Sequence, residues 1–139
     1  MISGSNQTVS ERFVHSAITS SINAAAIAVH KALGPGFLES IYEEALCVEL
    51  KRRQIAYQRQ VGVSVRYDGV PVGLYRLDLV IESKIIVEVK AVSTISAIHM
   101  ATVFAYLKST NAAVGLIINF GVDVVRIKRI FRGSHGVNE

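Results

Sequence analysis

Residues 75–92, YRLDLVIESKIIVEVKAV, constrain the fold most, because they hold two apolar segments separated by three polar residues. Two such segments joined by so short a polar link predict a β-hairpin. Three charged residues, Asp78, Glu88 and Lys90, interrupt the apolar segments. A charge among Leu, Val and Ile is costly unless it has a partner, so these residues need a physical explanation.

The register of this hairpin decides which charges meet. The strand period of two places Glu88 and Lys90 on one face. If the hairpin turns about Ser83, Asp78 lies directly opposite Glu88, with Cβ atoms about 4.5–5.5 Å apart. Two carboxylates that close need a cation between them, either Lys90 or a divalent Mg²⁺ or Mn²⁺ ion with oxygen ligands. The alternative is a solvated face on which Asp78 and Glu88 pair with Arg76 and Lys90, and the spacing alone leaves both interpretations open.

The rest of the chain alternates helical and strand patterns. Helical periodicity spans residues 9–33, where GPG stops it, then 37–53 and 95–109; strand patterns span 61–67, 73–81, 84–92, 112–120 and 124–131. This order predicts one α+β (mixed α/β) domain over residues 1–139, with a central mixed sheet of about five strands flanked by helices. The polar residues 1–8 are expected to be disordered.

Composition narrows the function. Half of the 139 residues are hydrophobic, which suits one domain with its own core. The single cysteine, Cys47, cannot form an internal disulfide, and we find no signal peptide pattern and no run of roughly 20 apolar residues. We therefore predict a cytoplasmic protein with no membrane partner. The net charge of +4 is compatible with a polyanionic partner such as nucleic acid.

The second helical segment, FLESIYEEALCVELKRR, adds acidic candidates. Glu39 and Glu43 stand at i and i+4 on one face, with Tyr42 beside them. Acidic residues in the first turns of a helix are also ordinary partners of the helix dipole. We interpret Glu43 and Glu44 in that way, and consider Glu39 the better candidate for a functional role.

Two motifs resemble a known family. LGPGFLESIYEEAL resembles the signature of the GxxExxY family, through Gly36, Glu39 and Tyr42. The Asp-x₉-Glu-x-Lys pattern of the hairpin resembles the core motif of the PD-(D/E)XK nuclease superfamily, in which that family is placed. The resemblance covers about residues 18–130, with the blocks VHKALGPGFLES, RLDLVI, IIVEVKAV, YLKST and VGLIINFG in the expected order. It implies a restriction-endonuclease-like core.

The resemblance also implies a site. Asp78 and Glu88 would hold a divalent metal, Mg²⁺ or Mn²⁺, and the backbone carbonyl of Val89 would add a ligand. Lys90 would steady the attacking water or the charge on the phosphate, and Glu39 would complete the site directly or through water. The reaction would be phosphodiester hydrolysis.

Further residues are candidates for nucleic-acid contacts. The family carries Gln-x-x-x-Tyr on the helix after the lysine strand; here Tyr106 is present, but Thr102 stands in the place of Gln. Gln60 resembles a family glutamine on the first strand. Arg126 and Lys128 share a face of the last strand and are candidates for phosphate contacts, although charges also protect an edge strand.

Two functions follow as hypotheses. The first is a metal-dependent nuclease that hydrolyses phosphodiester bonds in nucleic acid. The alternative is a catalytically weak or inactive nuclease-fold protein that binds nucleic acid or serves as a partner subunit. The sequence leaves open whether the nucleic acid is DNA or RNA, and a homodimer is a further partner arrangement that it allows.

Overall fold

The computed structural model describes residues 15–133. The elements in chain order are α2 (Ser16–Leu33), α3 (Glu39–Arg52), β1 (Tyr57–Tyr67), β2 (Val70–Ile81), β3 (Ile85–Lys90), α4 (Ala97–Ser109), β4 (Val114–Asn119) and β5 (Arg126–Phe131). This is the order that the sequence predicts. The disorder expected for residues 1–8, and the start of the first predicted helix, fall outside the described residues.

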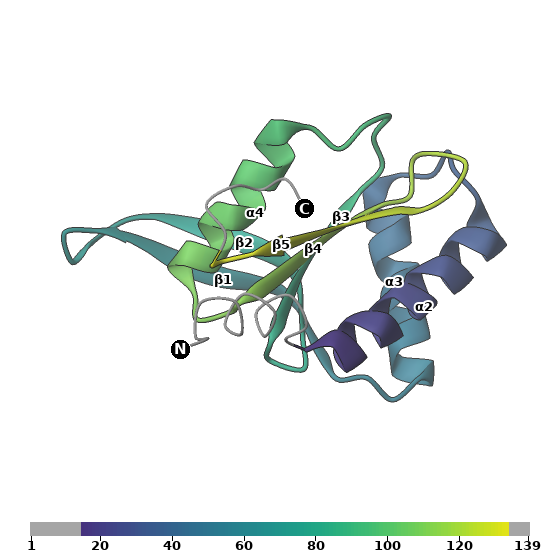
Figure 1. Cartoon of the computed structure of the whole chain (residues 1–139), viewed down its shortest axis with the longest axis horizontal. Helices are drawn as coiled ribbons and strands as arrows, with labels where there is room; N and C mark the ends of the chain where they lie inside the picture. The colour runs from purple at the N-terminus through teal and green to yellow at the C-terminus, as the bar shows by residue number, and fades with distance from the viewer. Residues whose placement is uncertain (1–14, 134–139) are drawn as a thin grey trace, which may run out of the picture.

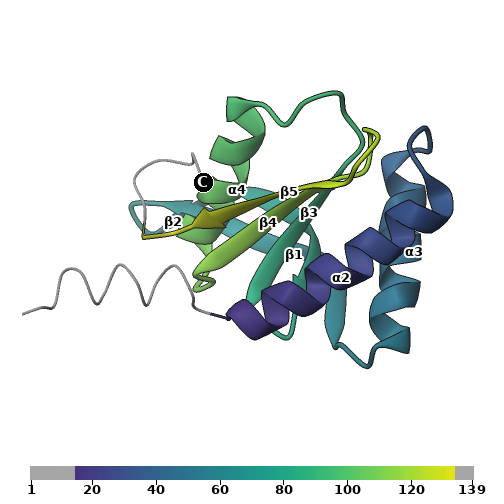
Figure 2. The ribbon, with the colours of Figure 1, turned by 45° about the vertical axis from the view of Figure 1, so that its right-hand side comes forward.

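The strands form one mixed sheet in the order β1-β2-β3-β4-β5. β3 and β4 are parallel, and the other neighbouring strands are antiparallel. Helix α4 connects the parallel pair across one face, while α2 and α3 cover the other (Figures 1 and 2). The predicted α+β fold with a central mixed sheet is confirmed. None of the helices within residues 15–133 is long and apolar enough to cross a membrane.

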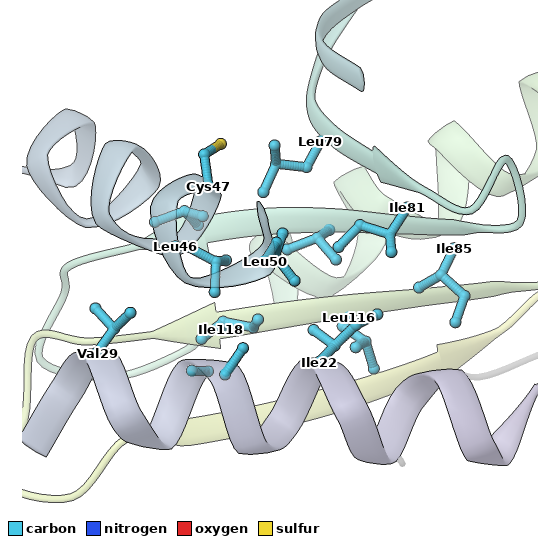
Figure 3. Packing of buried hydrophobic residues seen from close by; sticks show 14 of the residues in the cluster. Ile22, Val29, Leu46, Cys47, Leu50, Leu79, Ile81, Ile85, Leu116 and Ile118 are labelled. Carbon is cyan, nitrogen blue, oxygen red and sulfur yellow. The ribbon is translucent and has the colours of Figure 1, made fainter. Parts of the chain in front are cut away.

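Apolar side chains on both faces hold the helices to the sheet. In α2 the buried residues Ile22, Ala25, Ala26 and Val29 recur at helical spacing, which gives the helix one apolar stripe. Figure 3 shows Ile22 and Val29 of this stripe, and the packing against the sheet of the neighbouring helix α3, through Leu46, Leu50, Leu79, Ile81, Ile85, Leu116 and Ile118. On the opposite face, a second cluster joins α4 to the sheet through Leu77, Ile86, Val103, Tyr106, Leu107, Ile117 and Ile130.

The two central strands are buried along almost their whole length. All six residues of β4 and the first five of β3 are buried, because helices cover both faces of these strands. Strands of this kind are expected to be continuously apolar, and Glu88 and Asn119 are the polar exceptions. Both lie near the carboxyl ends of their strands, where the functional candidates gather.

The turn between α2 and α3 is built by Tyr42. Gly34 and Gly36 adopt φ values of +71° and +114°, which residues other than glycine rarely adopt. The Tyr42 hydroxyl donates to the carbonyl of Gly34 and accepts from the N–H of Phe37, and its ring stacks on Phe120 at 4.7 Å. Two positions of the Gly-x-x-Glu-x-x-Tyr motif therefore shape this turn, which places Glu39 at the start of α3.

The β1–β2 hairpin changes faces at Gln60 and Asp78. These two residues lie between registered pairs of the ladder, and Gln60 has a left-handed φ of 52°. Strict alternation would put Leu77 and Leu79 on the same face, yet Leu79 packs with α2 and α3 while Leu77 packs with α4. Beyond this point the hairpin, here called the arm (residues 61–77), extends away from α2 and α3 (Figure 1).

Candidate metal and nucleic-acid site

The hairpin of β2 and β3 has the predicted register. It turns about Ser83, and its last registered pair joins Leu79 to Val87. Asp78 and Glu88 are the next residue on each strand. The register therefore brings the two carboxylates to the point where the ladder ends.

The side chain of Asp78 replaces a backbone hydrogen-bond acceptor at the point where the β2–β3 ladder ends. Its Oδ2 accepts a hydrogen bond from the N–H of Val89 at 2.8 Å, so that a side chain stands where a β2 carbonyl would be in a continued ladder. Burial raises the pKa of Asp78, the Val89 N–H counteracts this, and the negative charges of Glu43 and Glu39 raise it further. Within residues 15–133, the second carboxylate oxygen, Oδ1, has no hydrogen-bond partner.

The environment of Glu88 strongly disfavours a negative charge on its carboxyl group. It is 9% exposed, and its Oε1 is buried without a hydrogen-bond partner in the part of the chain that the structure describes. Its Oε2 lies 3.8 Å from Nζ of Lys90. Burial, and then the charge of Asp78, raise the pKa of Glu88 to about 8. In this environment the carboxyl group is stable as the neutral acid, and its ionised form becomes stable when a cation is added beside it.

Glu39 approaches the same place from α3. It is the first residue of that helix, and its Oε2 accepts from the N–H of Ala91 at 3.3 Å, directly after β3 ends. Its charge raises the pKa of both Asp78 and Glu88. The structure thus brings Asp78, Glu88, Lys90 and Glu39 to one edge of the sheet, while their catalytic and metal-binding roles stay predictions.

Glu43 contributes more than the sequence indicates. Our interpretation as a helix-dipole partner is incomplete, because Glu43 is only 7% exposed and its carboxylate has specific partners. It accepts from Arg59 Nη2 at 3.0 Å and from Gln60 Nε2 at 3.1 Å. Its charge also raises the pKa of Asp78 and Glu88. The i, i+4 spacing of Glu39 and Glu43 was a sequence signal for a role of Glu43. That spacing does not predict its contacts with Arg59 and Gln60 of β1.

Tyr106 reaches the acidic pair from α4. It is 7% exposed and packs edge-to-face on Tyr75 with the ring centres 4.8 Å apart. Burial, followed by the charges of Glu88 and Asp78, raises the pKa of Tyr106 to about 12. The predicted nucleic-acid contact of Tyr106 is untested, but its position beside the carboxylates agrees with it.

Two other polar side chains of α4 form hydrogen bonds within or next to their own helix. The hydroxyl of Thr102 donates to the carbonyl of Ile98 in its own helix at 2.9 Å. His99 accepts from the N–H of Ser96 at 3.1 Å and so completes a capping box at the start of α4. Neither side chain is engaged with the acidic pair.

The two basic candidates on β5 share a face with the site. The cross-strand register aligns Lys90 with Asn119 and Asn119 with Arg126. Two positions earlier, Glu88 and Lys128 are aligned with the same β4 residue, Ile117. Because registered neighbours point to the same face, Arg126 and Lys128 lie on the face that carries Glu88 and Lys90.

Asn119 fixes the chain where it leaves β3, a role that the sequence analysis missed. Its Oδ1 accepts from the N–H of Val92 at 3.0 Å, and its Nδ2 donates to the carbonyl of Val92 at 2.9 Å. The N–H of Phe120 also donates to the carbonyl of Lys90 at 2.8 Å. A lone polar residue in an otherwise apolar strand was the signal that could have identified it.

The structure places fewer acidic side chains in position to bind a metal than the sequence predicts. Within residues 15–133, no group of three or more His, Cys, Asp or Glu side chains is arranged to hold a metal ion. Glu39 is directed to the N–H of Ala91, and Val89 presents its N–H to Asp78. Asp78 and Glu88 are therefore the two side-chain donors that the site offers, and Glu39 and the Val89 carbonyl as ligands stay predictions.

The fold and the charged edge define a class of protein. A five-stranded mixed sheet between helices, with an acidic pair and a lysine at the end of one hairpin, is a restriction-endonuclease-like domain. A model of the PD-(D/E)XK nuclease superfamily matches residues 16–130, and the chain belongs to that superfamily. Searches of curated proteins and of solved structures gave no match. Membership of the GxxExxY family within it stays a prediction.

Proposed function

We propose that the protein is a divalent-metal-dependent nuclease that hydrolyses phosphodiester bonds in DNA or RNA. The observation that carries this proposal is the buried Oε1 of Glu88, which lacks a partner in the described residues and lies in a carboxyl group beside Asp78 and Lys90. An unpaired buried oxygen is costly, and a catalytic role or a bound ion would account for it. The superfamily match supports the same conclusion.

The donor set fits a hard cation. Asp78 and Glu88 would hold Mg²⁺ or Mn²⁺, with the Val89 carbonyl and Glu39 as further ligands, because both ions prefer oxygen donors. A cation bound there would polarise a phosphoryl oxygen and lower the pKa of a bound water. The free Oδ1 of Asp78 and Oε1 of Glu88 are the atoms available for it.

The protein's own groups would position and neutralise the substrate. The Lys90 ammonium lies beside Glu88 and would offset negative charge that develops on the phosphate. Asn119 and Phe120 hold the chain at and after Lys90, so the lysine is presented from a fixed backbone. Tyr106 is buried beside the acidic pair and would limit the access of water to it from the α4 side.

A second candidate function is nucleic-acid binding without turnover. Thr102 stands where related nucleases carry Gln, and its hydroxyl is bound to its own helix. The site therefore lacks the amide that could hold a phosphate or a water. This observation favours weak cleavage over fast cleavage, and allows a protein that binds metal and nucleic acid without hydrolysis.

The test combines cleavage and metal binding. Labelled DNA and RNA are incubated with purified protein in Mg²⁺ or Mn²⁺, and Mn²⁺ binding is measured by calorimetry. We expect weak metal-dependent cleavage that Lys90→Ala abolishes with unchanged circular dichroism, and Mn²⁺ binding that Asp78→Ala abolishes. Lys84→Ala, an exposed lysine in the turn of the same hairpin, is the matched control and should keep full activity.

Each outcome separates the two functions. Metal binding without cleavage of any nucleic acid would establish the binding function, and a wild type that binds neither Mg²⁺ nor Mn²⁺ would reject the nuclease. A homodimer and a cytoplasmic location stay predictions, which sedimentation and cell fractionation would test.

A further inference from the structure

A polar cavity lies next to the candidate metal site. It has a volume of about 360 Å³ and opens where the ends of β3 and β4 meet the start of β5. Its lining consists of Ser93, Thr94, Ile95, Asn119, Val122 and Arg126. This lining contains one cationic side chain and no acidic one.

The free polar groups of the cavity suit an anion. Arg126 is exposed, and its guanidinium forms no hydrogen bond or ion pair within residues 15–133. The hydroxyls of Ser93 and Thr94 are likewise without partners in that range, whereas the amide of Asn119 is occupied by Val92. A guanidinium fork with two hydroxyls beside it matches the oxygens of a phosphate.

The cavity is close to the acidic pair and lies on the face of the sheet that carries Glu88 and Lys90. Lys90, Asn119 and Arg126 form one row across three neighbouring strands. With strands about 4.8 Å apart, the Cα atoms of Lys90 and Arg126 are about 10 Å apart. A nucleic-acid strand carries a phosphate about every 3.4 Å of its axis, so the cavity lies about one to three nucleotides from the acidic pair.

We infer that this cavity binds a backbone phosphate of the same strand whose scissile phosphate lies at Asp78 and Glu88. The inference rests on the proposed function and adds a second phosphate contact to it, formed by Arg126, Ser93 and Thr94.

The first test measures salt-dependent affinity. Binding of a labelled oligonucleotide in Mn²⁺ is followed on the Lys90→Ala background, which keeps the metal ligands and is expected not to cleave. Arg126→Ala should weaken binding roughly three- to tenfold and reduce the slope of log affinity against log salt by about 0.7–0.9. Arg126→Lys should keep the slope. Arg52→Ala, an exposed arginine in the last turn of α3, should change neither quantity.

A second test locates the phosphate. One uncharged methylphosphonate linkage is moved stepwise along the oligonucleotide, and the affinity is measured with and without Arg126→Ala. At a single position near the cut linkage, the methylphosphonate should weaken binding when Arg126 is present and have no further effect in Arg126→Ala. If Lys90→Ala still cleaves, the same comparison is made on the KM of cleavage.

The outcomes distinguish this inference from the proposed function. An unchanged slope in Arg126→Ala, or additive effects at every linkage, overturns the phosphate site while cleavage by the wild type still supports the nuclease. Failure of the parent protein to bind any nucleic acid rejects the proposed function, and the inference falls with it.

Discussion

The carboxyl group of Glu88 lies between the apolar residues Val87 and Val89 of β3, and only one of its oxygens is near a cation. Because burial and Asp78 raise the pKa of Glu88 to about 8, the metal-free folded protein holds a proton that the unfolded chain releases near pH 4.5. Stability in the absence of metal must therefore fall as the pH rises between these two values.

A substitution at this residue should reveal that dependence. Glu88→Gln keeps the shape of the neutral acid and cannot ionise. We expect it to leave the free energy of unfolding nearly unchanged at pH 4, and to stabilise the metal-free protein progressively up to pH 8, by at most about 1.4 kcal/mol per pH unit. Urea unfolding in EDTA at a series of pH values measures this. Parallel wild-type and Glu88→Gln curves across pH 5–8 would contradict the raised pKa.

At the scale of the elements, the loop that follows β3 depends on close backbone contact with the end of β4. A Cβ added to Gly121 would lie 2.6 Å from the nitrogen of Val92 and 2.7 Å from the carbonyl carbon of Ala91. Both are main-chain atoms, so the clash cannot be relieved by a side-chain rotation. This contact and the Asn119 amide together fix the chain that leaves Lys90.

We expect Gly121→Ala to cost about 1–3 kcal/mol of stability or more, through overpacking against the backbone. Gly73→Ala is the matched control, since a Cβ there meets nothing within 4 Å, and it should change stability by less than about 0.5 kcal/mol. Chemical denaturation of both variants checks this. Equal stabilities of Gly121→Ala and wild type would show that the loop adapts without strain.

Helix α4 carries the departure from the family pattern. Thr102 lies one turn before Tyr106, and its hydroxyl is bound to Ile98 rather than directed to the site. We expect Thr102→Gln to raise cleavage or nucleic-acid affinity roughly tenfold at most, because one charge-assisted hydrogen bond contributes about 1.5–3 kcal/mol. Rates and affinities are compared at fixed salt and metal. An unchanged rate and affinity would mean that this position does not face the substrate.

The elements and the hairpin register were predictable because they depend on local patterns. Apolar periods set the helices and strands, and the three-residue link set the turn about Ser83. The missed features depend on contacts between distant segments. Gln60 in its left-handed conformation meets Glu43 from another element, and Asn119 at the end of β4 binds Val92, which follows the neighbouring strand β3. No short window of sequence contains both partners of these contacts.

At the scale of the whole molecule, metal binding should be coupled to global stability. A ligand that binds only the folded state at 100 times its Kd adds about 2.7 kcal/mol, which raises Tm by roughly 10 °C for a chain of this size. We expect Mn²⁺ to produce such a rise in the wild type and Asp78→Ala to abolish it. Asp123→Asn, an exposed acidic control, should keep it. A rise of equal size in all three proteins would place the metal elsewhere.

The change of face at Gln60 and Asp78 makes the arm modular in length. The body of the sheet packs with α2 and α3 and the start of the arm packs with α4, and a second irregularity in the ladder lies nearer the tip, between Val65 and Arg66. Excision of equal numbers of paired residues from both strands near the Asp68-Gly69 turn would therefore leave the orientation of every side chain below the change of face unaltered. A chain with a shorter arm should keep its acidic pair, which makes the arm the natural place for insertions, tags or grafted loops.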